Sequence, residues 1–450
     1  MAPKDSSRPT RLTRVALLGH GTVGRGVVEL LADRGGDLRR RTGVGFDVVR
    51  VAVRDLARHQ AEASTLRMTD DAHDVATAAE ADVVVELIGG IEPARTLVLA
   101  AIEAGKSVVT ANKALIAAHG PELFAAARRA GVVVAFEASC GGGIPIVGSL
   151  AGGLVADDHR ALVGILNGTS NAILTSMSVR GQSYAEALKE AQDAGFAEAD
   201  PTLDVNGSDA AQKLSILAGL AFGETIQPDA IHREGIDGLD PRDVAFASEL
   251  GYVIKLLAVA RRDEDDRLAM SVFPGLLPAS DPMSDVNGPF NAVAVYGKAL
   301  GRSLLVGRGA GGMPTAAAVV GDLVSVANGS AKAAFSTLQM LPDVARPADL
   351  LDFGLTRHRY YLRLVADDAP GVLADVTRAL GNAGISLASV TQREAPSVGG
   401  GSVPVIITTH EAREASVRSA VEVLSGLASI KEPPAVLRIV DMPKEPGDHA

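Results

Sequence analysis

Residues 15–31 restrict the fold of this chain more than any other stretch of its sequence. The continuous apolar run Val15–Leu18 leads directly into Gly-His-Gly-Thr-Val-Gly at 19–24, and apolar residues then recur at helical spacing as far as Leu31. A buried strand followed by G-x-G-x-x-G and a helix is the arrangement that holds a dinucleotide pyrophosphate. The alternative is a glycine turn that only packs a helix on a sheet. We expect the cofactor to contact Gly19, Gly21, Thr22, Val23 and Gly24.

The next hundred residues alternate between apolar runs and helical patterns. The apolar runs are Asp47–Val53, Asp82–Leu87, Ser107–Thr110 and Val132–Phe136. A helical pattern spans 93–104, and Pro121 is expected to open a further helix at its first turn. Strands that alternate with helices predict an α/β fold with a mostly parallel, Rossmann-type sheet over residues 1–138.

A glycine-dense segment at 138–145 marks the exit from this first domain. Residues 139–305 mix strands with long helices, which is typical of an α+β domain. Residues 307–312 form a second glycine-rich turn, which precedes another helical pattern. The sequence from 328 to 356 lacks clear periodicity and contains prolines, so we expect connecting sequence there, with a linker over 341–356.

The remaining residues are expected to form a compact module. Its first segment alternates Tyr360, Leu362 and Leu364 with Arg359, Tyr361 and Arg363. Such alternation predicts a strand with only one buried face. A helix after Pro370, two strands, a second helix over 412–427 and a last strand complete a βαββαβ pattern over 357–441. Residues 442–450 are expected to form a tail.

Composition limits the classes of protein that need to be considered. Lys plus Arg number 43 and Asp plus Glu 54, which gives a net charge of −11, whereas a nucleic-acid-binding body normally carries a basic excess. The single cysteine, Cys140, excludes an internal disulfide and a cysteine-based zinc site. The first ten residues are polar, and no apolar run approaches the roughly 18 residues of a membrane span. We therefore expect a cytoplasmic protein that binds neither nucleic acid nor membrane.

The second apolar run bears on which dinucleotide is bound. It ends at Val53 and is followed by Arg54 and Asp55, so Arg54 falls nearest to the expected ribose 2′ position. An arginine suits a 2′-phosphate, whereas NAD sites usually offer a carboxylate. Asp55 leaves NAD(H) open, but the sequence favours NADP(H).

Polar chemistry is densest between residues 191 and 213. This stretch contains Glu198, Asp200, Asp204, Asp209 and Lys213. Asp209 and Lys213 are four residues apart on a helix expected to begin near Ser208, so they share a helix face. An ordinary surface ion pair would show the same spacing. Lys113 is a second candidate, because it follows the carboxyl end of a parallel strand, where open α/β sheets bind ligands.

Six motifs lie between residues 15 and 325, and both their sequences and their order along the chain are informative. They are the glycine loop, Ala-Asn-Lys at 111–113, Glu-Ala-Ser-Cys-Gly-Gly-Gly-Ile-Pro at 137–145, Asn-Gly-Thr-Ser-Asn at 167–171, the segment 191–213 and Gly-Ala-Gly-Gly at 309–312. In combination they resemble the homoserine dehydrogenases. Residues 357–441 resemble an ACT domain, with the turn from strand to helix at 368–373.

This resemblance implies an activity and a set of roles. The family interconverts L-homoserine and L-aspartate 4-semialdehyde with NAD(P), on the route to threonine, methionine and isoleucine. The resemblance implies Lys213 as proton donor and acceptor, with Asp209 and Lys113 as further catalytic residues. The implied substrate contacts are Glu198, Asp204, Asp209 and Lys113. The further implied cofactor contacts are Lys113, Gly195 and Gly312.

The resemblance also implies a metal, an assembly and an effector. The backbone carbonyls of Glu137, Cys140, Gly142 and Ile144 are expected to bind a monovalent cation, sodium in this family. Residues 306–340 are expected to return to the nucleotide-binding domain, and residues 139–305 to bind substrate and form a homodimer or homotetramer. Threonine is the expected effector, acting through the ACT domain.

Two other functions remain open at this point. An aspartate-semialdehyde dehydrogenase would need a thiolate nucleophile, which only Cys140 could supply, and a histidine base, although no histidine is close to it in sequence. The other is a regulatory protein that binds a dinucleotide and an amino acid without catalysis. Lys213 and its acidic neighbours favour an enzyme.

Overall fold

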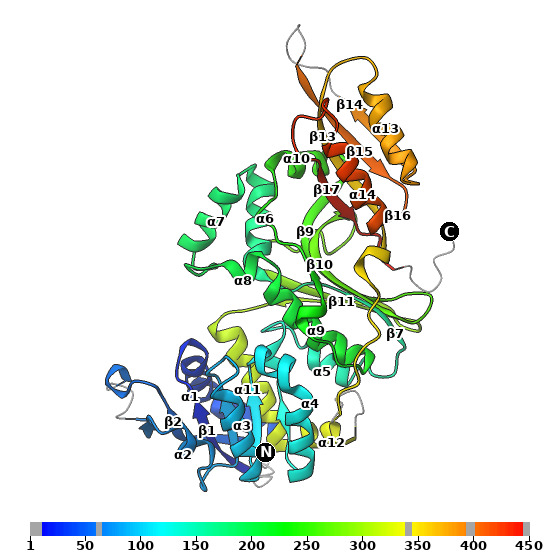
Figure 1. Cartoon of the computed structure of the whole chain (residues 1–450). Coiled ribbons are helices and arrows are strands. Elements are labelled where there is room, and N and C mark those ends of the chain that lie inside the picture. Colours follow the sequence, from blue (N-terminus) through cyan, green and yellow to red (C-terminus); the bar gives the residue numbers. More distant parts are fainter. Residues whose placement is uncertain (1–10, 60–64, 338–343, 393–400, 444–450) are drawn as a thin grey trace, which may run out of the picture. The chain divides into compact units, whose positions relative to one another are not determined.

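The structure is a computed structural model, which describes residues 11–59, 65–337, 344–392 and 401–443 (Figure 1). The polar leader, the boundary expected at residue 340 and all but two residues of the expected tail lie outside this part of the chain. Contacts divide the chain into two compact units. The first consists of the described residues up to His159, Ala211–Ala230 and Asn291–Ala348, and the second of Arg160–Ala210, Ile231–Phe290 and the described residues from Asp349 onward. The units follow contacts and not motifs, so the expected domain limits stay a prediction.

The first unit contains a sheet of six parallel strands in the order β3-β2-β1-β4-β5-β6. The strands are β1 (Arg11–Leu18), β2 (Val44–Ala52), β3 (Met68–Thr69), β4 (Val83–Glu86), β5 (Ser107–Thr110) and β6 (Val134–Ala135). Their apolar residues are buried because helices cover both faces of the sheet. The strand order reverses between β1 and β4, and ligands of such sheets bind outside the carboxyl ends of the strands at that point. The predicted parallel Rossmann-type sheet is confirmed.

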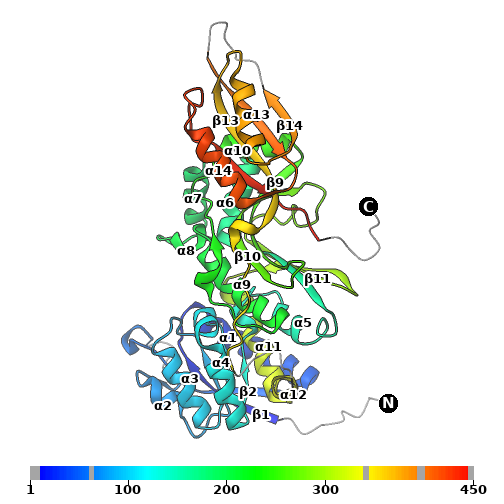
Figure 2. The ribbon, with the colours of Figure 1, turned by 45° about the vertical axis from the view of Figure 1, so that its right-hand side comes forward.

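Two layers of helices flank this sheet. The helices are α1 (Thr22–Thr42), α2 (Ala72–Ala76), α3 (Ala94–Glu103), α4 (Lys113–Ala130), α11 (Gly312–Asn328) and α12 (Ser330–Thr337). Helix α3 packs against both α2 and α4, whereas α1 packs against α11. Figure 2 shows α2, α3 and α4 together on one side of the strands and α11 on the other. None of the helices in the described part of the chain is long and apolar enough to span a bilayer.

Two helix predictions in this unit were wrong. Helix α4 does not begin at Pro121 but at Lys113, and Pro121 lies inside it. A proline inside a helix removes one backbone hydrogen bond, and here the packed apolar face outweighs that loss. Helix α12 falls in sequence for which we expected no regular structure. Its Phe335 is buried in edge contact with Phe124 of α4, a tertiary contact that periodicity could not reveal.

Three further elements complete the part of this unit that bears on the site. Strands β11 (Phe290–Gly297) and β12 (Gly301–Arg308) are neighbours. The glycine-rich turn was expected to begin at Gly307, but β12 continues to Arg308. Helix α9 (Ser208–Phe222) begins in the second unit and continues into the first. Its start matches the prediction, and Leu214, Ile216, Leu217 and Leu220 are buried as expected.

The second unit contains a long run of strands in the order β7-β9-β10-β17-β13-β15-β14, with β8 beside β10 and β16 beside β13. The strands are β7 (His159–Ile165), β8 (His232–Arg233), β9 (Tyr252–Arg262), β10 (Leu268–Pro278), β13 (Arg357–Asp367), β14 (Leu387–Gln392), β15 (Ser402–Thr409), β16 (Ala412–Arg413) and β17 (Ala435–Ile439). The helices are α6 (Gly168–Arg180), α7 (Tyr184–Asp193), α8 (Thr202–Val205), α10 (Pro241–Glu249), α13 (Val372–Asn382) and α14 (Glu414–Ser425). Strand β17 pairs in parallel with β10, so the carboxyl-terminal module continues the sheet.

The predicted βαββαβ module is confirmed, with α13 and α14 packed against each other over its sheet (Figure 1). Tyr360, Leu362 and Leu364 of β13 enter its core as predicted. The prediction of one buried face was wrong, because Tyr361 is fully buried and Arg363 is 4% exposed. The Arg363 guanidinium donates to both oxygens of Asp243 on α10, at 2.6 and 2.9 Å. Alternation assigns residues to faces, but it does not say whether a second element covers the polar face.

Candidate functional site

The glycine loop has the backbone that its sequence predicts. Gly19 has φ +102°, a conformation that favours glycine, and a Cβ there would lie 2.9 Å from the Leu87 carbonyl oxygen. Gly21 is the N-cap of α1, and a Cβ at this residue would meet no atom within 4 Å. The space above the amino terminus of α1 is therefore open. The free N–H groups of such a helix end attract phosphate.

The start of α11 lies against this loop. A Cβ on Gly312 would lie 2.8 Å from Cγ2 of Thr22, so only glycine fits there without displacement. A Cβ on Gly26 of α1 would in turn lie 3.1 Å from Cβ of Ala316. Residues far apart in sequence thus pack together at the start of α1, and the first unit holds the described residues of 291–348 together with the glycine loop.

Arg54 and Asp55 follow β2 and differ in what they can offer a ligand. The Asp55 carboxylate accepts the backbone N–H of Ala57 at 3.0 Å and pairs with Arg58 at 3.1 Å. Arg54 is exposed. The Asp55 carboxylate is therefore engaged by neighbouring residues of its own turn, while the Arg54 guanidinium is accessible to solvent.

Lys113 is the first residue of α4, and two buried polar residues fix the helix start beside it. The side chain of Asn112 caps α4 by accepting the Leu115 N–H, and its amide donates to the Gly90 carbonyl at 2.7 Å. Glu86 ends β4, fully buried, and accepts the hydroxyl of Thr110 at 2.5 Å. Glu86 was not among the predicted site residues. The signal for it was a lone carboxylate in the apolar strand at 83–87.

Lys213 and Lys113 both lie near the Cys140 thiol. Burial raises the pKa of this fully buried thiol to about 12, although a hydrogen bond from Ser139 and the positive charges of Lys213 and Lys113 act to lower it. Residues 100 positions apart thus bring two ammonium groups toward one point in the first unit. Lys213 is only 8% exposed. An ordinary surface ion pair, the alternative reading of the spacing, does not fit this burial.

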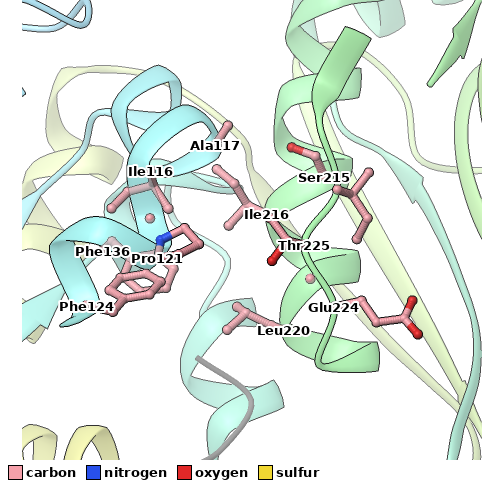
Figure 3. Close-up of a pocket in the computed structure, with 13 residues that line it drawn as sticks. Ile116, Ala117, Pro121, Phe124, Phe136, Ser215, Ile216, Leu220, Glu224 and Thr225 are labelled. Atoms are coloured by element: carbon pink, nitrogen blue, oxygen red, sulfur yellow. The ribbon is translucent and has the colours of Figure 1, made fainter. Parts of the chain in front are cut away.

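Helices α4 and α9 face each other across an apolar pocket of about 60 Å³ (Figure 3). Ile116, Pro121 and Phe124 lie on the α4 side, and Ser215, Ile216 and Leu220 lie on the α9 side. None of the predicted site residues lines this pocket. It lies between the two helices that carry Lys113 and Lys213, and its lining is mainly apolar, with Ser215, Glu224 and Thr225 as the polar exceptions.

The acidic residues of the second unit gather around Asn167. The Asn167 amide nitrogen donates to Asp204 of α8 and to Asp209 of α9, both at 2.8 Å. Asp209 is 6% exposed, and it lies in the first turn of α9, one turn before Lys213. Sequence analysis placed Asn167 in a motif but gave it no role.

The structure does not bring every predicted substrate residue into this cluster. Gly195 has φ +74° and begins the loop after α7, and Glu198 is exposed on the same loop. The Phe196 carbonyl of this loop accepts the Thr169 hydroxyl at 2.7 Å. The loop is therefore tied to α6 through its backbone, while the Glu198 carboxylate faces solvent.

The turn at 137–145 packs against the second glycine-rich turn. Gly142 has φ +52°, and a Cβ there would lie 2.6 Å from the Gly309 carbonyl oxygen. The Gly143 N–H donates to the Arg308 carbonyl at 2.8 Å. Among the described residues no cluster of three or more His, Cys, Asp or Glu side chains could hold a metal ion, so a cation here would depend on backbone oxygens.

Two carboxyl groups lie beside this turn. The Glu137 carboxylate accepts the N–H groups of Val147 and Gly148, at 2.8 and 2.7 Å, and burial raises its pKa. Asp322 of α11 accepts the backbone N–H of Glu137 at 2.9 Å. Burial, aided by the negative charge of Glu137, raises the pKa of Asp322 to about 7.

The parallel sheet, the open glycine loop and the start of α11 packed against that loop define a Rossmann-type dinucleotide-binding protein. The family model "Homoserine dehydrogenase, NAD binding domain" matches residues 19–137, the model "Homoserine dehydrogenase" matches 145–324, and an ACT domain model matches 360–426. A homoserine dehydrogenase of Pseudomonas aeruginosa is 44% identical over 429 residues, which cover 95% of this chain and 98% of that protein. The chain belongs to the homoserine dehydrogenase family, as its motifs predicted, and is an oxidoreductase that uses NAD(P).

A further relative and two solved structures also match this chain. A homoserine dehydrogenase of Corynebacterium glutamicum is 41% identical, and the match covers 96% of each chain. The crystal structure of a homoserine dehydrogenase from Thiobacillus denitrificans has a TM-score of 0.89 at 44% identity, covering 96% of this chain and 99% of that one. A hyperthermophilic archaeal homoserine dehydrogenase in complex with NADPH has a TM-score of 0.59 at 27% identity over 70% of this chain and 97% of its own.

The buried thiol generates a prediction. A thiol with a pKa near 12 is protonated at neutral pH and cannot act as a nucleophile. We expect Cys140→Ser to keep kcat for homoserine oxidation within about threefold of wild type, because the two side chains differ little in size. Steady-state assays of the two proteins measure this. A loss of about 10³-fold or more in the folded variant would instead support covalent thiol chemistry.

Proposed function

We propose that this chain reversibly interconverts L-aspartate 4-semialdehyde and L-homoserine with NAD(P), with Lys213 as the residue that moves the proton. The observation that carries the proposal is the place of Lys213, a buried ammonium one helical turn after Asp209 and near the same thiol as Lys113. A buried cation is costly unless other groups compensate for its lost hydration. Buried charged side chains are common in catalytic sites and uncommon on helices that have only a structural role.

The chemistry divides between hydride and proton. A dinucleotide held at the glycine loop would supply or accept the hydride at the terminal carbon of the substrate. When the aldehyde is reduced, the ammonium of Lys213 gives a proton to the carbonyl oxygen as that oxygen becomes a hydroxyl. When the alcohol is oxidised, the neutral amine of Lys213 takes the hydroxyl proton back. A general acid or base in this role contributes about 10²–10⁴-fold in rate.

The amino-acid end of the substrate needs partners of both signs. Asp204 and Asp209 are fixed side by side by Asn167, and their negative charge suits the α-ammonium group of the substrate. Lys113 supplies a positive charge for an oxygen of the substrate or of the dinucleotide. Glu198 does not belong to the cluster around Asn167; its exposed carboxylate is proposed as a further substrate contact on family resemblance.

The dinucleotide fits the loop at α1, with Gly19, Gly21, Thr22, Val23 and Gly24 around the phosphates. The open space at Gly21 and the close contact of Gly312 with Thr22 support this placement. We further propose that NADP(H) is preferred to NAD(H). The exposed Arg54 supports this preference, as does the engagement of Asp55 with its own turn.

A monovalent cation, sodium by family resemblance, is proposed at the carbonyls of Glu137, Cys140, Gly142 and Ile144. Neutral backbone oxygens on one tight turn are a donor set that suits a hard cation of low charge. The cation would hold the turn that carries Cys140 and would take no part in the proton or hydride step.

The ACT domain is proposed to regulate activity in response to L-threonine. A pocket of about 200 Å³ lies at the strand-to-helix turn of this domain, between residues 366–376 and Gln392. Strand β17 joins the domain to β10, and Arg438 of β17 donates to both oxygens of Glu234, at 2.6 and 2.8 Å. The ACT domain is therefore packed against the rest of the second unit, and a ligand bound to the domain could act on that unit through this contact.

Placement in threonine, methionine and isoleucine synthesis, and assembly as a homodimer or homotetramer, are proposed on family resemblance.

Lys213→Met tests the proposed function. Methionine keeps the length of the side chain but cannot transfer a proton, so we expect kcat to fall about 10³-fold in both directions while the Kd for NADPH stays within about twofold. Aspartate semialdehyde-dependent oxidation of NADPH at 340 nm is the assay, with fluorescence titration of NADPH for binding. The matched control is Lys189→Met at an exposed lysine of α7, which should retain wild-type kcat. A wild-type protein that binds NADPH without turnover would point to a non-catalytic regulator.

Arg54→Ala tests the preference for NADP(H). Loss of the guanidinium removes a charge-assisted contact to the 2′-phosphate, so the KM for NADPH should rise about 10- to 100-fold while that for NADH changes less than about twofold. Arg41→Ala, at the opposite end of α1 from the glycine loop, is the control. Equal effects on both dinucleotides would remove Arg54 from cofactor selection.

Gln392→Ala tests the effector site. A deletion of the ACT domain would strip β17 from β10, so a point variant is preferable. We expect the L-threonine concentration for half-maximal inhibition to rise about tenfold, with basal kcat unchanged, because one hydrogen-bonding side chain is lost from the pocket. Gln182→Ala, on the connection between α6 and α7, is the matched control. Insensitivity of the wild type to threonine, or identical inhibition of the variant, would contradict the assignment.

A further inference from the structure

Asn167 lies at a junction of three elements in the second unit. It follows β7 and caps α6, with its side-chain oxygen accepting the Ser170 N–H at 2.8 Å. Its amide nitrogen uses both hydrogens, one toward Asp204 and one toward Asp209. The side chain is 4% exposed, so solvent cannot substitute for these bonds. Every hydrogen-bonding group of this amide thus has a protein partner.

The first turn of α6 holds the surrounding segments as well. The Ser170 hydroxyl donates to the Asp204 carbonyl at 2.9 Å, which adds a second tie to α8. The Thr169 hydroxyl holds the loop after α7 at Phe196. Residues 167–170 therefore hold the loop, α8 and the start of α9, the three segments that carry Glu198, Asp204 and Asp209.

The chemistry of an amide suits this place better than the chemistry of a charged side chain. Two carboxylates close together repel each other, so a side chain that holds both in place should not add to their negative charge. A lysine or arginine between them would neutralise the negative charge that an incoming ammonium needs. The Asn167 amide donates to both carboxylates and adds no charge, so it fixes their direction and leaves the net charge of the cluster unchanged.

We propose that Asn167 is a positioning residue for the reaction, holding Asp204 and Asp209 in the orientation that receives the substrate ammonium and setting the turn of α9 that leads to Lys213. This inference rests on the proposed function and assigns a residue that the family motifs leave without a role. Asn167 itself touches neither the transferred hydride nor the proton. Its effect is exerted through the two carboxylates.

Two variants that preserve the helix cap test the role. Aspartate and serine are both good N-cap residues, so Asn167→Asp and Asn167→Ser should keep α6 intact. Both lose the amide donors, and Asn167→Asp adds a third negative charge to the cluster. We expect kcat/KM for homoserine to fall about 10²-fold in Asn167→Asp and about tenfold in Asn167→Ser, in part through a higher KM for homoserine.

The KM for NADP⁺ separates positioning from general damage. It should stay within about twofold of wild type in both variants, because the glycine loop lies in the other unit. Asn328→Asp is the matched control. Its side-chain oxygen likewise accepts a backbone N–H, from Ser330 at 2.9 Å, but on the exposed connection between α11 and α12. This control should behave as wild type.

Each outcome has one reading. Wild-type kcat/KM in both Asn167 variants would reduce Asn167 to a helix cap and overturn the proposal. Loss of the cooperative thermal transition, or of NADP⁺ binding, in both variants would make it a folding residue and overturn it equally. A wild-type enzyme that reduces neither NADP⁺ nor NAD⁺ with homoserine would contradict the proposed function itself, which is a separate result from variants that match an active wild type.

Discussion

The start of α9 is the constraint on which the proposed reaction centre depends. A helix that begins at Ser208 places Asp209 in its first turn and Lys213 about 6 Å further along its axis, on the same face. The carboxylate lies where the positive end of the helix favours it, and the ammonium is buried one turn later. A helix start two residues later would leave Asp209 outside the helix and remove its i, i+4 relation to Lys213, although the sequence motif would be unchanged.

Neutral amides fix the charged groups on both candidate segments. Asn112 caps the helix that begins with Lys113, and Asn167 caps α6 while it orients Asp209. Because an amide can accept for the cap and donate elsewhere, it fixes a charged neighbour without altering the local charge. In the first unit, burial raises the pKa of the Cys140 thiol, on which the charges of Lys113 and Lys213 also act.

The sequence was sufficient where a local pattern decides the structure and insufficient where a tertiary contact decides it. The parallel strands, the glycine loop and the start of α9 follow from apolar runs, glycines and spacing. The start of α4 did not, because capping by Asn112 and burial of its apolar face outweigh the preference of Pro121 for a first turn. The buried polar face of β13 depends on Asp243, more than a hundred residues away. The bonds of Asn167 to two carboxylates join segments about forty residues apart, and no periodicity encodes them.

Chemical rescue tests the central role of Lys213 most directly. In Lys213→Ala, the missing amine can be replaced by methylamine from solution if the position serves proton transfer. The account predicts that homoserine oxidation by this variant is very slow without amine and rises saturably as methylamine is added, whereas the wild type does not respond. A variant that retains the wild-type rate without any amine, or one that is inactive and stays so at every amine concentration while still binding homoserine and NADP⁺, would contradict it.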